Sequence, residues 1–215
     1  LSATRARFST SWDDGTLAVY PFRFRLTVEY ELCGSTIVKT HRIENEGGAP
    51  MPFEVGGHEA YSTRLESGER MSDWRVRFEG LVEAACIEAY DMDDAGILCL
   101  PKRLVPLENG CLTQTPEQLG LDTVVLENVP GNKATLENVR SGRAVEVEFP
   151  DFPYLGIWTK ALGESSSDEA RYLCVEPWSA LPDGHFAPRE LAEKPGVRVA
   201  APGEQVTLTY RMTFR

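Results

Sequence analysis

The 215-residue chain contains 33 acidic and 22 basic side chains, for a formal net charge of −11. This length suits one large domain, over residues 1–215, with a well-buried core, and the acidic excess argues against a nucleic-acid partner, whose phosphates require clustered Lys and Arg. No segment approaches the ~18 apolar residues of a membrane span, and the N-terminus lacks the basic-then-apolar layout of a signal peptide, so we expect a soluble, cytoplasmic protein with no membrane partner.

Strictly alternating apolar and polar side chains mark the first predicted strand, residues 22–32. A period of two is typical of a half-buried strand in an antiparallel sheet. We therefore expect its apolar face to be buried and its Arg and Glu side chains to face water. The same alternation returns at residues 74–78, 145–149 and 206–214, which predicts an all-β fold.

Turn-forming residues separate these strands along the chain. They occur at Asp14-Gly15, Cys33-Gly34, Glu46-Gly47-Gly48, Asn109-Gly110, Pro130-Gly131-Asn132, Ser141-Gly142 and Pro202-Gly203. Short strands at such spacing predict a β-sandwich or a large barrel rich in hairpins. Helix is expected only as short turns at residues 115–119 and 188–192, and the polar residues 163–169 are expected to form a solvated hairpin loop.

The five cysteines are widely spaced and never form a C-x-x-C pair. Zinc and redox motifs need closely spaced ligands or thiols, so we expect reduced, mostly buried cysteines and no bound metal. The sequence also lacks a catalytic-serine elbow, a phosphate-cradling glycine loop, a dinucleotide fingerprint and an HExxH motif. Any chemistry carried out by this chain is therefore expected to need no cofactor.

Three histidines can be weighed as acid–base groups. His41 lies in a polar-rich strand, residues 39–44, where a partly exposed structural imidazole is the preferred interpretation. His185 lies in a loop and is a candidate for the rim of a site. His58 follows two glycines, which allow a ligand to approach the backbone closely or the chain to turn unusually. On these residues alone, a structural role for His58 is an equal alternative.

Glu176 differs from most acidic side chains of the chain because apolar and aromatic residues flank it on both sides. A carboxylate in such surroundings either has a partner or has its pKa raised towards the range useful to a general base. The alternative is a strand-end carboxylate that faces water. The aromatic run at residues 149–158, which includes Tyr154 and Trp158, predicts a stacking wall for a sugar, with core packing as the alternative.

Several segments of the chain resemble the aldose 1-epimerase (mutarotase) family, in family order and over most of the chain. They are Tyr20 to Phe24 and on through Glu44-Asn45, Met51 to His58, Phe149 to Thr159, Cys174 to Trp178, and Glu193 to Gly196. The resemblance implies a β-supersandwich that interconverts the α and β anomers of a free aldose, such as an aldohexose, without metal or cofactor. We expect a monomer or a homodimer.

The resemblance also implies roles for individual residues. His58 matches the family's histidine that protonates the ring oxygen, and Glu176 matches its glutamate that takes the proton from the anomeric hydroxyl. Asp122 is the nearest candidate in order for the family's substrate-binding aspartate. The aromatic side chains expected to contact the sugar are Trp178, Tyr154 and Trp158.

The chain begins at Leu1, and nothing in it matches the family's N-terminal portion, which carries another histidine and an arginine near the sugar. The resemblance therefore implies a fold lacking its N-terminal strands. We expect a sheet edge or an apolar face to be exposed where those strands belong. We also expect this 215-residue piece to aggregate or to show little activity until an upstream segment is added.

Three other functions remain open from the sequence. A hexose-phosphate 1-epimerase of the same superfamily needs Arg or Lys converging on the pocket, and only Arg64 and Arg171 lie close in sequence to His58 or Glu176. A non-catalytic sugar-binding or sensing domain needs no acid and base, and a structural β-domain needs no site. The catalytic interpretation predicts that His58 and Glu176 face one cavity, less than about 10 Å apart.

Overall fold

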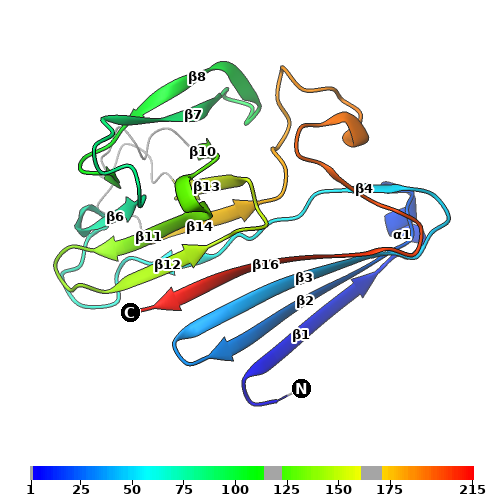
Figure 1. Ribbon diagram of the computed structural model, residues 1–215, viewed down its shortest axis with the longest axis horizontal. Helices are drawn as coiled ribbons and strands as arrows, with labels where there is room; N and C mark the ends of the chain where they lie inside the picture. The colour runs from blue at the N-terminus through cyan, green and yellow to red at the C-terminus, as the bar shows by residue number, and fades with distance from the viewer. Residues whose placement is uncertain (1, 114–122, 161–170) are drawn as a thin grey trace.

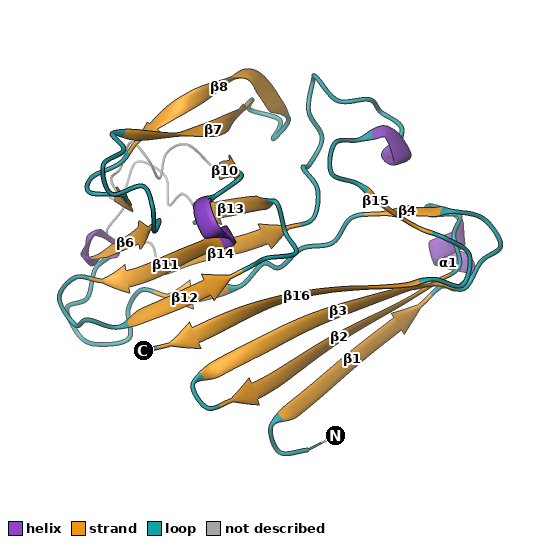
Figure 2. Cartoon of the chain, in the orientation of Figure 1, coloured by secondary structure: helices purple, strands orange, loops and turns teal. Residues whose placement is uncertain are grey.

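Antiparallel β-strands make up most of the structure, a computed structural model that describes residues 2–113, 123–160 and 171–215. Within these ranges helix is limited to α1 (Asp14–Leu17) and the 3-10 turns η1 (Met71–Asp73), η2 (Pro130–Asn132) and η4 (Leu191–Glu193), as Figure 2 shows. The expected all-β class is confirmed. The strands are β1 (Arg5–Ser11), β2 (Phe24–Cys33), β3 (Thr36–Asn45), β4 (Met51–Phe53), β5 (Ala60–Ser62), β6 (Trp74–Arg77), β7 (Cys86–Met92), β8 (Leu98–Pro106), β9 (Cys111–Thr113), β10 (Val124–Glu127), β11 (Lys133–Asn138), β12 (Ala144–Glu148), β13 (Tyr154–Trp158), β14 (Tyr172–Trp178), β15 (Arg198–Ala200) and β16 (Gln205–Phe214).

Two large sheets contain most of these strands. The eight-stranded sheet has the order β1-β2-β3-β16-β12-β11-β6-β9, the six-stranded sheet has the order β5-β14-β13-β10-β7-β8, and β4 pairs with β15. In Figure 1 the long strands β1, β2, β3 and β16 run side by side below, and the β7–β8 hairpin lies above. The two sheets pack face to face as a β-sandwich.

The main apolar core lies between the two large sheets, and the six-stranded sheet is covered on its other face as well. That second face, here called the outer face, carries a further cluster of buried side chains: Tyr90, Leu98, Val125, Tyr154 and Leu181. A sheet buried on both faces needs apolar side chains at successive positions rather than at alternate ones. This explains why β13 and β14 read as nearly continuous apolar runs.

The first predicted strand is β2, which begins two residues later than expected, at Phe24. Its Glu29 is only 6% exposed, although the alternation predicts that this side chain faces water. Arg7 on β1 and Arg42 on β3 cover the carboxylate, with N–O distances of 2.5 and 3.5 Å. Cations from both neighbouring strands therefore bury Glu29 in ion pairs, whereas the apolar face of β2 is only partly buried and its Leu32 is 48% exposed.

The expected turn at Asp14-Gly15 is wrong, because these residues begin α1. The Asp13 carboxylate accepts a hydrogen bond from the Thr16 amide at 2.7 Å, which caps the first turn of the helix. The turn at Cys33-Gly34 is present, and Gly34 has the positive φ of 63° that glycine tolerates.

The two predicted helical turns have different outcomes. The one at residues 188–192 corresponds to η4, which begins three residues later. The one at residues 115–119 lies outside the described residues, as does the whole of the polar loop predicted at 163–169.

His41 is buried, not partly exposed as its polar-rich strand suggested. Its side chain lies opposite buried Leu208 of β16, is 2% exposed, and stacks on Tyr210 with 5.8 Å between ring centroids. Burial lowers the pKa of His41 to about 4, and the nearby Lys39 charge adds to this effect. The imidazole is therefore a neutral core group at pH 7.

The edge strand β1 is exposed along its whole length, and Phe8 on it is 64% exposed. Figure 1 shows the N-terminus beside this edge. Among the described residues, no helix has the length and apolar character needed to cross a membrane.

Candidate active site

Glu176 lies on β14 with its side chain on the outer face of the six-stranded sheet. Its neighbours Val175 and Leu173 belong to the core between the sheets, so alternation along the strand turns Glu176 to the other side. The carboxylate side chain is only 4% exposed, and Oε2 accepts a hydrogen bond from the indole Nε1 of Trp178 at 3.2 Å. Glu176 is therefore a buried carboxylate with an aromatic partner, and not a strand-end charge facing water.

Gly156 on β13 lies directly opposite Glu176 and makes room for this arrangement. A Cβ at Gly156 would lie 2.5 Å from Cζ2 of Trp178, closer than real Cβ contacts. Only a residue without a side chain lets the indole lie across the sheet at this point. The glycine thereby allows the hydrogen bond from Trp178 to Glu176.

His58 lies in the loop between β4 and β5, and the backbone of this loop is attached to β14. The Gly57 amide donates a hydrogen bond to the Pro177 carbonyl at 2.9 Å. A side chain at Gly57 would clash with the Tyr210 hydroxyl and the Glu59 carboxylate. The absence of a side chain at Gly57 therefore allows Tyr210 and Glu59 to pack closely against this loop.

The loop brings the imidazole of His58 to the carboxylate of Glu176. The distance from His58 Nε2 to Glu176 Oε1 is 3.4 Å, and the two side chains are 65% and 4% exposed. Trp158 meets the imidazole edge-on, with 5.6 Å between ring centroids. An exposed imidazole thus lies next to a buried carboxylate, and the distance between them is well inside the predicted limit of about 10 Å.

The surroundings raise the pKa of Glu176. Burial is the main cause, while the nearby His58 and hydrogen bonds from Trp178 and the Cys174 thiol act in the opposite direction. Burial also raises the pKa of Cys174 to about 12, and the Glu176 charge adds to this. The thiol therefore stays protonated and donates to the carboxylate. The contact between Cys174 and Glu176 could be expected from the sequence, because residues two apart lie on the same face of a strand.

The other residues predicted to bind a sugar have different positions. Trp178 contacts Glu176, and Trp158 contacts His58. Tyr154 is only 6% exposed and packs in the outer cluster, so its ring supports the site from within the protein. Asp122 lies outside the described residues. Contact of these side chains with a sugar stays a prediction.

Glu59, Lys39 and Tyr210 form an anchor behind His58 that the sequence did not predict. Glu59 points into the space between the sheets, where its carboxylate accepts hydrogen bonds from Lys39 Nζ at 2.5 Å and from the Tyr210 hydroxyl. The Glu59 carbonyl accepts a hydrogen bond from the Val175 amide at 3.3 Å. Glu59 therefore ties the His58 loop to β3 and β16 of one sheet and to β14 of the other.

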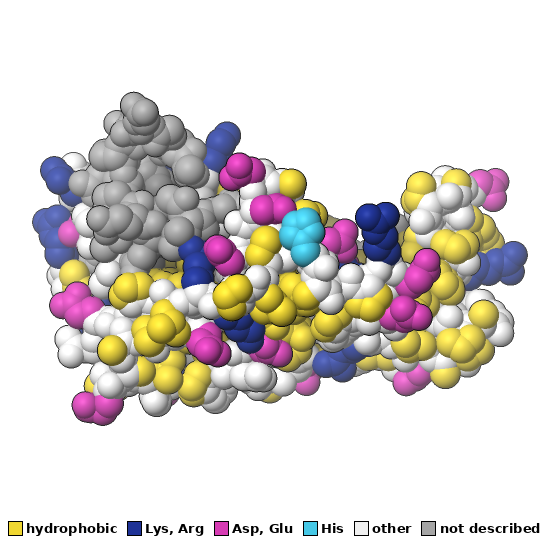
Figure 3. All heavy atoms as spheres, turned by 90° about the horizontal axis from the view of Figure 1, so that it is seen from above, with side chains coloured by type: hydrophobic (Ala, Val, Ile, Leu, Met, Phe, Trp, Pro, Cys, Tyr) yellow, Lys and Arg dark blue, Asp and Glu magenta, His cyan; other side chains and the backbone are white. Residues whose placement is uncertain are grey.

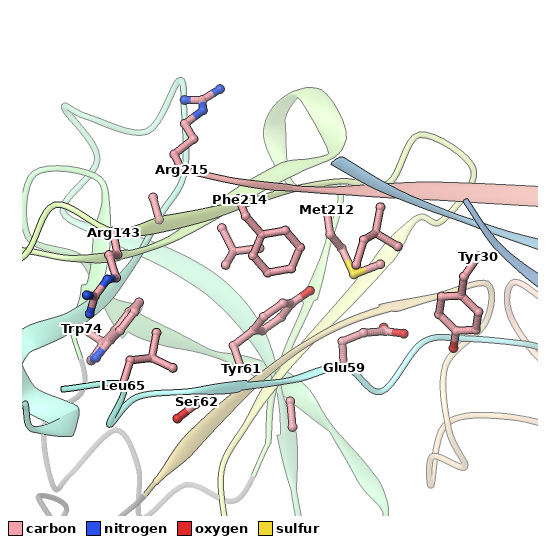
Figure 4. Close-up of a pocket in the computed structure, with 14 residues that line it drawn as sticks. Tyr30, Glu59, Tyr61, Ser62, Leu65, Trp74, Arg143, Met212, Phe214 and Arg215 are labelled. Carbon is pink, nitrogen blue, oxygen red and sulfur yellow. The ribbon is translucent and has the colours of Figure 1, made fainter. Parts of the chain in front are cut away.

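Glu59 also borders a pocket of about 570 Å³ between the sheets, drawn in Figure 4. Aromatic and aliphatic side chains dominate its lining, and Figure 4 shows Tyr61, Phe214 and Met212 around its centre. His58 and Glu176 are not among the lining residues. This apolar pocket is therefore separate from the candidate site on the outer face.

Among the residues that the structure describes, two groups of side chains place possible metal ligands near one another. The donor atoms of His58, Cys174 and Glu176 lie within 4.8 Å of one another, but the raised pKa of Cys174 disfavours the thiolate that a metal needs. These three side chains are better suited to proton transfer. The second group is Asp93, Cys99 and His185.

Comparisons with known proteins identify the family and the fold of this chain. The family model for aldose 1-epimerase matches residues 2–194. The chromosomal LacX protein of Lactococcus lactis is 29% identical over 197 residues, which cover 91% of this chain, and the chain spans 63% of the length of that relative.

Solved structures show the same fold. A galactose mutarotase related enzyme from Lactobacillus acidophilus superposes with a TM-score of 0.87 at 24% identity, over 100% of this chain and 69% of that one. A galactose mutarotase-like protein from Lactobacillus casei gives 0.85 at 24% identity, over 100% of this chain and 71% of that one. The fold is the galactose mutarotase-like β-sandwich, and the chain belongs to the aldose 1-epimerase family.

Proposed function

We propose that this protein interconverts the α and β anomers of a free aldose by acid–base ring opening and reclosure. The observation that carries the proposal is the buried carboxylate of Glu176 beside the exposed imidazole of His58, 3.4 Å away. Family membership supports an isomerase of this kind. The proposal adds the residues and their roles.

Glu176, ionised, accepts the proton of the anomeric hydroxyl, and His58, protonated, donates a proton to the ring oxygen. The bond between C1 and the ring oxygen breaks while C1 becomes an aldehyde carbon, so no proton or electron is left over. Rotation about the C1–C2 bond presents the other face of the aldehyde. Reclosure with the two roles reversed returns both protons and gives the other anomer.

The separation of the two groups suits this exchange. At 3.4 Å, the contact between His58 and Glu176 is longer than an ordinary hydrogen bond, so it leaves the imidazole free to turn towards a ligand. The raised pKa of Glu176 makes its carboxylate a stronger base than an exposed glutamate. The pair thus offers one proton donor and one proton acceptor to a bound sugar.

A neutral sugar is a better substrate than a sugar phosphate. Lys102, which lies 4.3 Å over the Tyr90 ring of the outer face, is paired with Glu127 at 2.7 Å. Lys194 is paired with Glu54 and Asp183. On the face seen in Figure 3, Lys and Arg side chains are interspersed with Asp and Glu. Lys102 and Lys194 are therefore already paired with carboxylates, which disfavours them as ligands of a phosphate.

A non-catalytic sugar-binding domain is the second candidate from a different class. Binding requires hydrogen bonds and stacking surfaces, but it gives no reason to bury a carboxylate with a raised pKa beside an imidazole. The acid–base pair therefore favours the enzyme.

Polarimetry of freshly dissolved α-glucose and α-galactose tests the proposal in the intact protein. We expect the protein to accelerate the approach to equilibrium for at least one free aldose and to have less effect on the corresponding 6-phosphate. Sugar binding by calorimetry without any acceleration would identify a binding domain instead. Acceleration of the phosphate alone would favour the hexose-phosphate epimerase.

A further inference from the structure

Two side chains of the β7–β8 hairpin and one from a distant loop meet away from the acid–base pair. Asp93 follows β7, Cys99 lies on β8, and His185 lies in the loop after β14. One donor atom from each lies within 4.8 Å of the other two, and His185 Nε2 is 2.7 Å from Asp93 Oδ2. A carboxylate, a thiol and an imidazole therefore converge on one point.

The backbone around these side chains is fixed independently of any ligand. The second carboxylate oxygen of Asp93 accepts hydrogen bonds from the amides of Ala95 and Ile97, at 3.0 and 2.9 Å. Leu98 donates to the Asp183 carbonyl and accepts from the His185 amide, both at 2.9 Å. The loop that carries His185 is thus attached to the strand that carries Cys99, which gives a preorganised set of donors.

We propose that Asp93, Cys99 and His185 form a Zn²⁺ site with a fourth position open to water. Zinc binds thiolate sulfur, imidazole nitrogen and carboxylate oxygen at about 2.0–2.3 Å, so tetrahedral donor atoms stand roughly 3–4 Å apart. The observed donors lie within 4.8 Å of one another, with 2.7 Å between His185 Nε2 and Asp93 Oδ2, so adjustments of these side chains would bring them to the spacing that zinc requires. Mixed N, S and O donors favour zinc over Mg²⁺ and Ca²⁺, which prefer oxygen.

Zinc binding changes the protons in a defined way. The thiol proton of Cys99 is released to solvent, and His185 Nε2 gives up any proton it shares with Asp93, so that this nitrogen donates its lone pair to the metal. The side chain of His185 is 64% exposed and that of Asp93 is 34% exposed, so the metal can enter from solvent. No oxidant or other reactant is needed.

A zinc ion at this site would stabilise the edge of the outer face. Phe186, next to His185, stacks on Tyr90 at 5.6 Å, and the Tyr90 hydroxyl donates to Glu127 on β10. Zinc at the three donors would hold the loop after β14 against the β7–β8 hairpin. A plain Asp93–His185 ion pair would do this more weakly, and without zinc the Cys99 thiol only donates a hydrogen bond to the Ile97 carbonyl, at 3.5 Å.

Cobalt titration of the intact protein, kept reduced, tests the site without reference to its proposed activity. We expect one Co²⁺ per chain with a thiolate-to-cobalt charge-transfer band, which Zn²⁺ then removes by displacement. Cys99→Ser should abolish the band, and His185→Gln should weaken Co²⁺ binding at least tenfold. Cys86→Ser and Cys174→Ser should leave the band unchanged.

Thermal unfolding gives a second measurement that does not depend on the spectrum. Zn²⁺ should raise the Tm of the wild-type protein and of Cys174→Ser, but not that of Cys99→Ser or His185→Gln. His185 is exposed, so His185→Gln is expected to fold even if Cys99→Ser does not. Absence of the band in the wild-type protein, its survival in Cys99→Ser, or its loss only in Cys174→Ser would overturn the proposal.

Discussion

At the scale of single residues, the pKa of Glu176 links the site to a pH dependence. A base must be ionised to act, and burial raises the pKa of Glu176 above the ordinary value of 4.5. We expect kcat/KM for anomerisation to fall on the acid side at a pH above 4.5. A profile that stays flat down to pH 4.5 would exclude Glu176 as the base.

The same shift predicts the sign of a stability change. Because folding raises the pKa of Glu176, the folded state binds this proton more tightly than the unfolded state. The stabilisation is complete below the unfolded pKa and is lost as the pH rises through the folded pKa. At pH 8, Glu176→Gln should therefore have a Tm no lower than that of the wild-type protein. A clear loss of Tm would show that the charged carboxylate stabilises the fold.

Gly156→Ala tests the geometry around the carboxylate. The added Cβ would lie 2.5 Å from the Trp178 ring and would push the indole away from Glu176. We expect destabilisation of about 1–3 kcal/mol in urea unfolding and a loss of activity of at least tenfold. Gly48→Ala is the matched control, because nothing lies within 4 Å of its Cβ. Equal behaviour of the two variants would contradict the account.

The family resemblance predicted the pair of His58 and Glu176, which the structure places 3.4 Å apart. Their neighbouring residues alone left a structural role for His58 equally open. The contact of Cys174 with Glu176 follows from strand alternation. Gly156 was not recognisable, because its role depends on the register that places it opposite Glu176. The cluster of Asp93, Cys99 and His185 was not recognised for a similar reason: Asp93 and Cys99 share one hairpin, but His185 follows 92 residues after Asp93, whereas motif rules search for closely spaced ligands.

At the scale of elements, the anchor formed by Lys39, Glu59 and Tyr210 joins both sheets behind His58. Lys39 is only 7% exposed, so Glu59→Gln leaves a buried ammonium without its ion-pair partner. We expect this variant to lose about 3–5 kcal/mol in urea unfolding. Lys39→Met combined with Glu59→Gln should recover most of the loss.

The double variant also separates stability from positioning. If Glu59 positions His58, the double variant should fold well and still anomerise sugars more slowly than the wild-type protein, with kcat reduced more than KM is raised. If the double variant lost as much stability as Glu59→Gln and Lys39→Met together, the two side chains would not form a coupled buried pair. Wild-type kcat in the double variant would show that Glu59 has no positioning role.

Strand predictions succeeded where one face of a sheet is apolar. β12 and β16 lie within one residue of their predicted bounds because their side chains alternate. β13 and β14 could not be found by alternation, since the six-stranded sheet is covered on both faces. The three-residue strands β4 and β5 are too short to give a periodic signal.

At the scale of the whole molecule, the order of strands in the sheets was beyond local patterns. β16, at the end of the chain, lies between β3 and β12, and this pairing brings Tyr210 to Glu59 and Leu208 to His41. These contacts decide that His41 is buried. The sequence near His41 contains no sign of them.

His41 should make the stability of the whole fold depend on pH. Its folded pKa of about 4 lies below the ordinary 6.5, so the unfolded state binds this proton first. Stability should be lost as the pH falls from 6.5, by about 3 kcal/mol at pH 4. His41→Phe should remove this part of the acid sensitivity in urea unfolding. An identical loss of stability at acid pH in the wild-type protein and in His41→Phe would show that His41 is not the cause.

Exchange NMR between the anomeric protons of a free aldose tests the central claim most directly, with intact wild-type protein, Glu176→Gln and His58→Asn compared under one condition. The proposed acid–base pair predicts that each variant slows exchange roughly 100-fold or more while it still folds and binds the sugar. Wild-type exchange rates in both variants would contradict the claim and would leave only a sugar-binding domain.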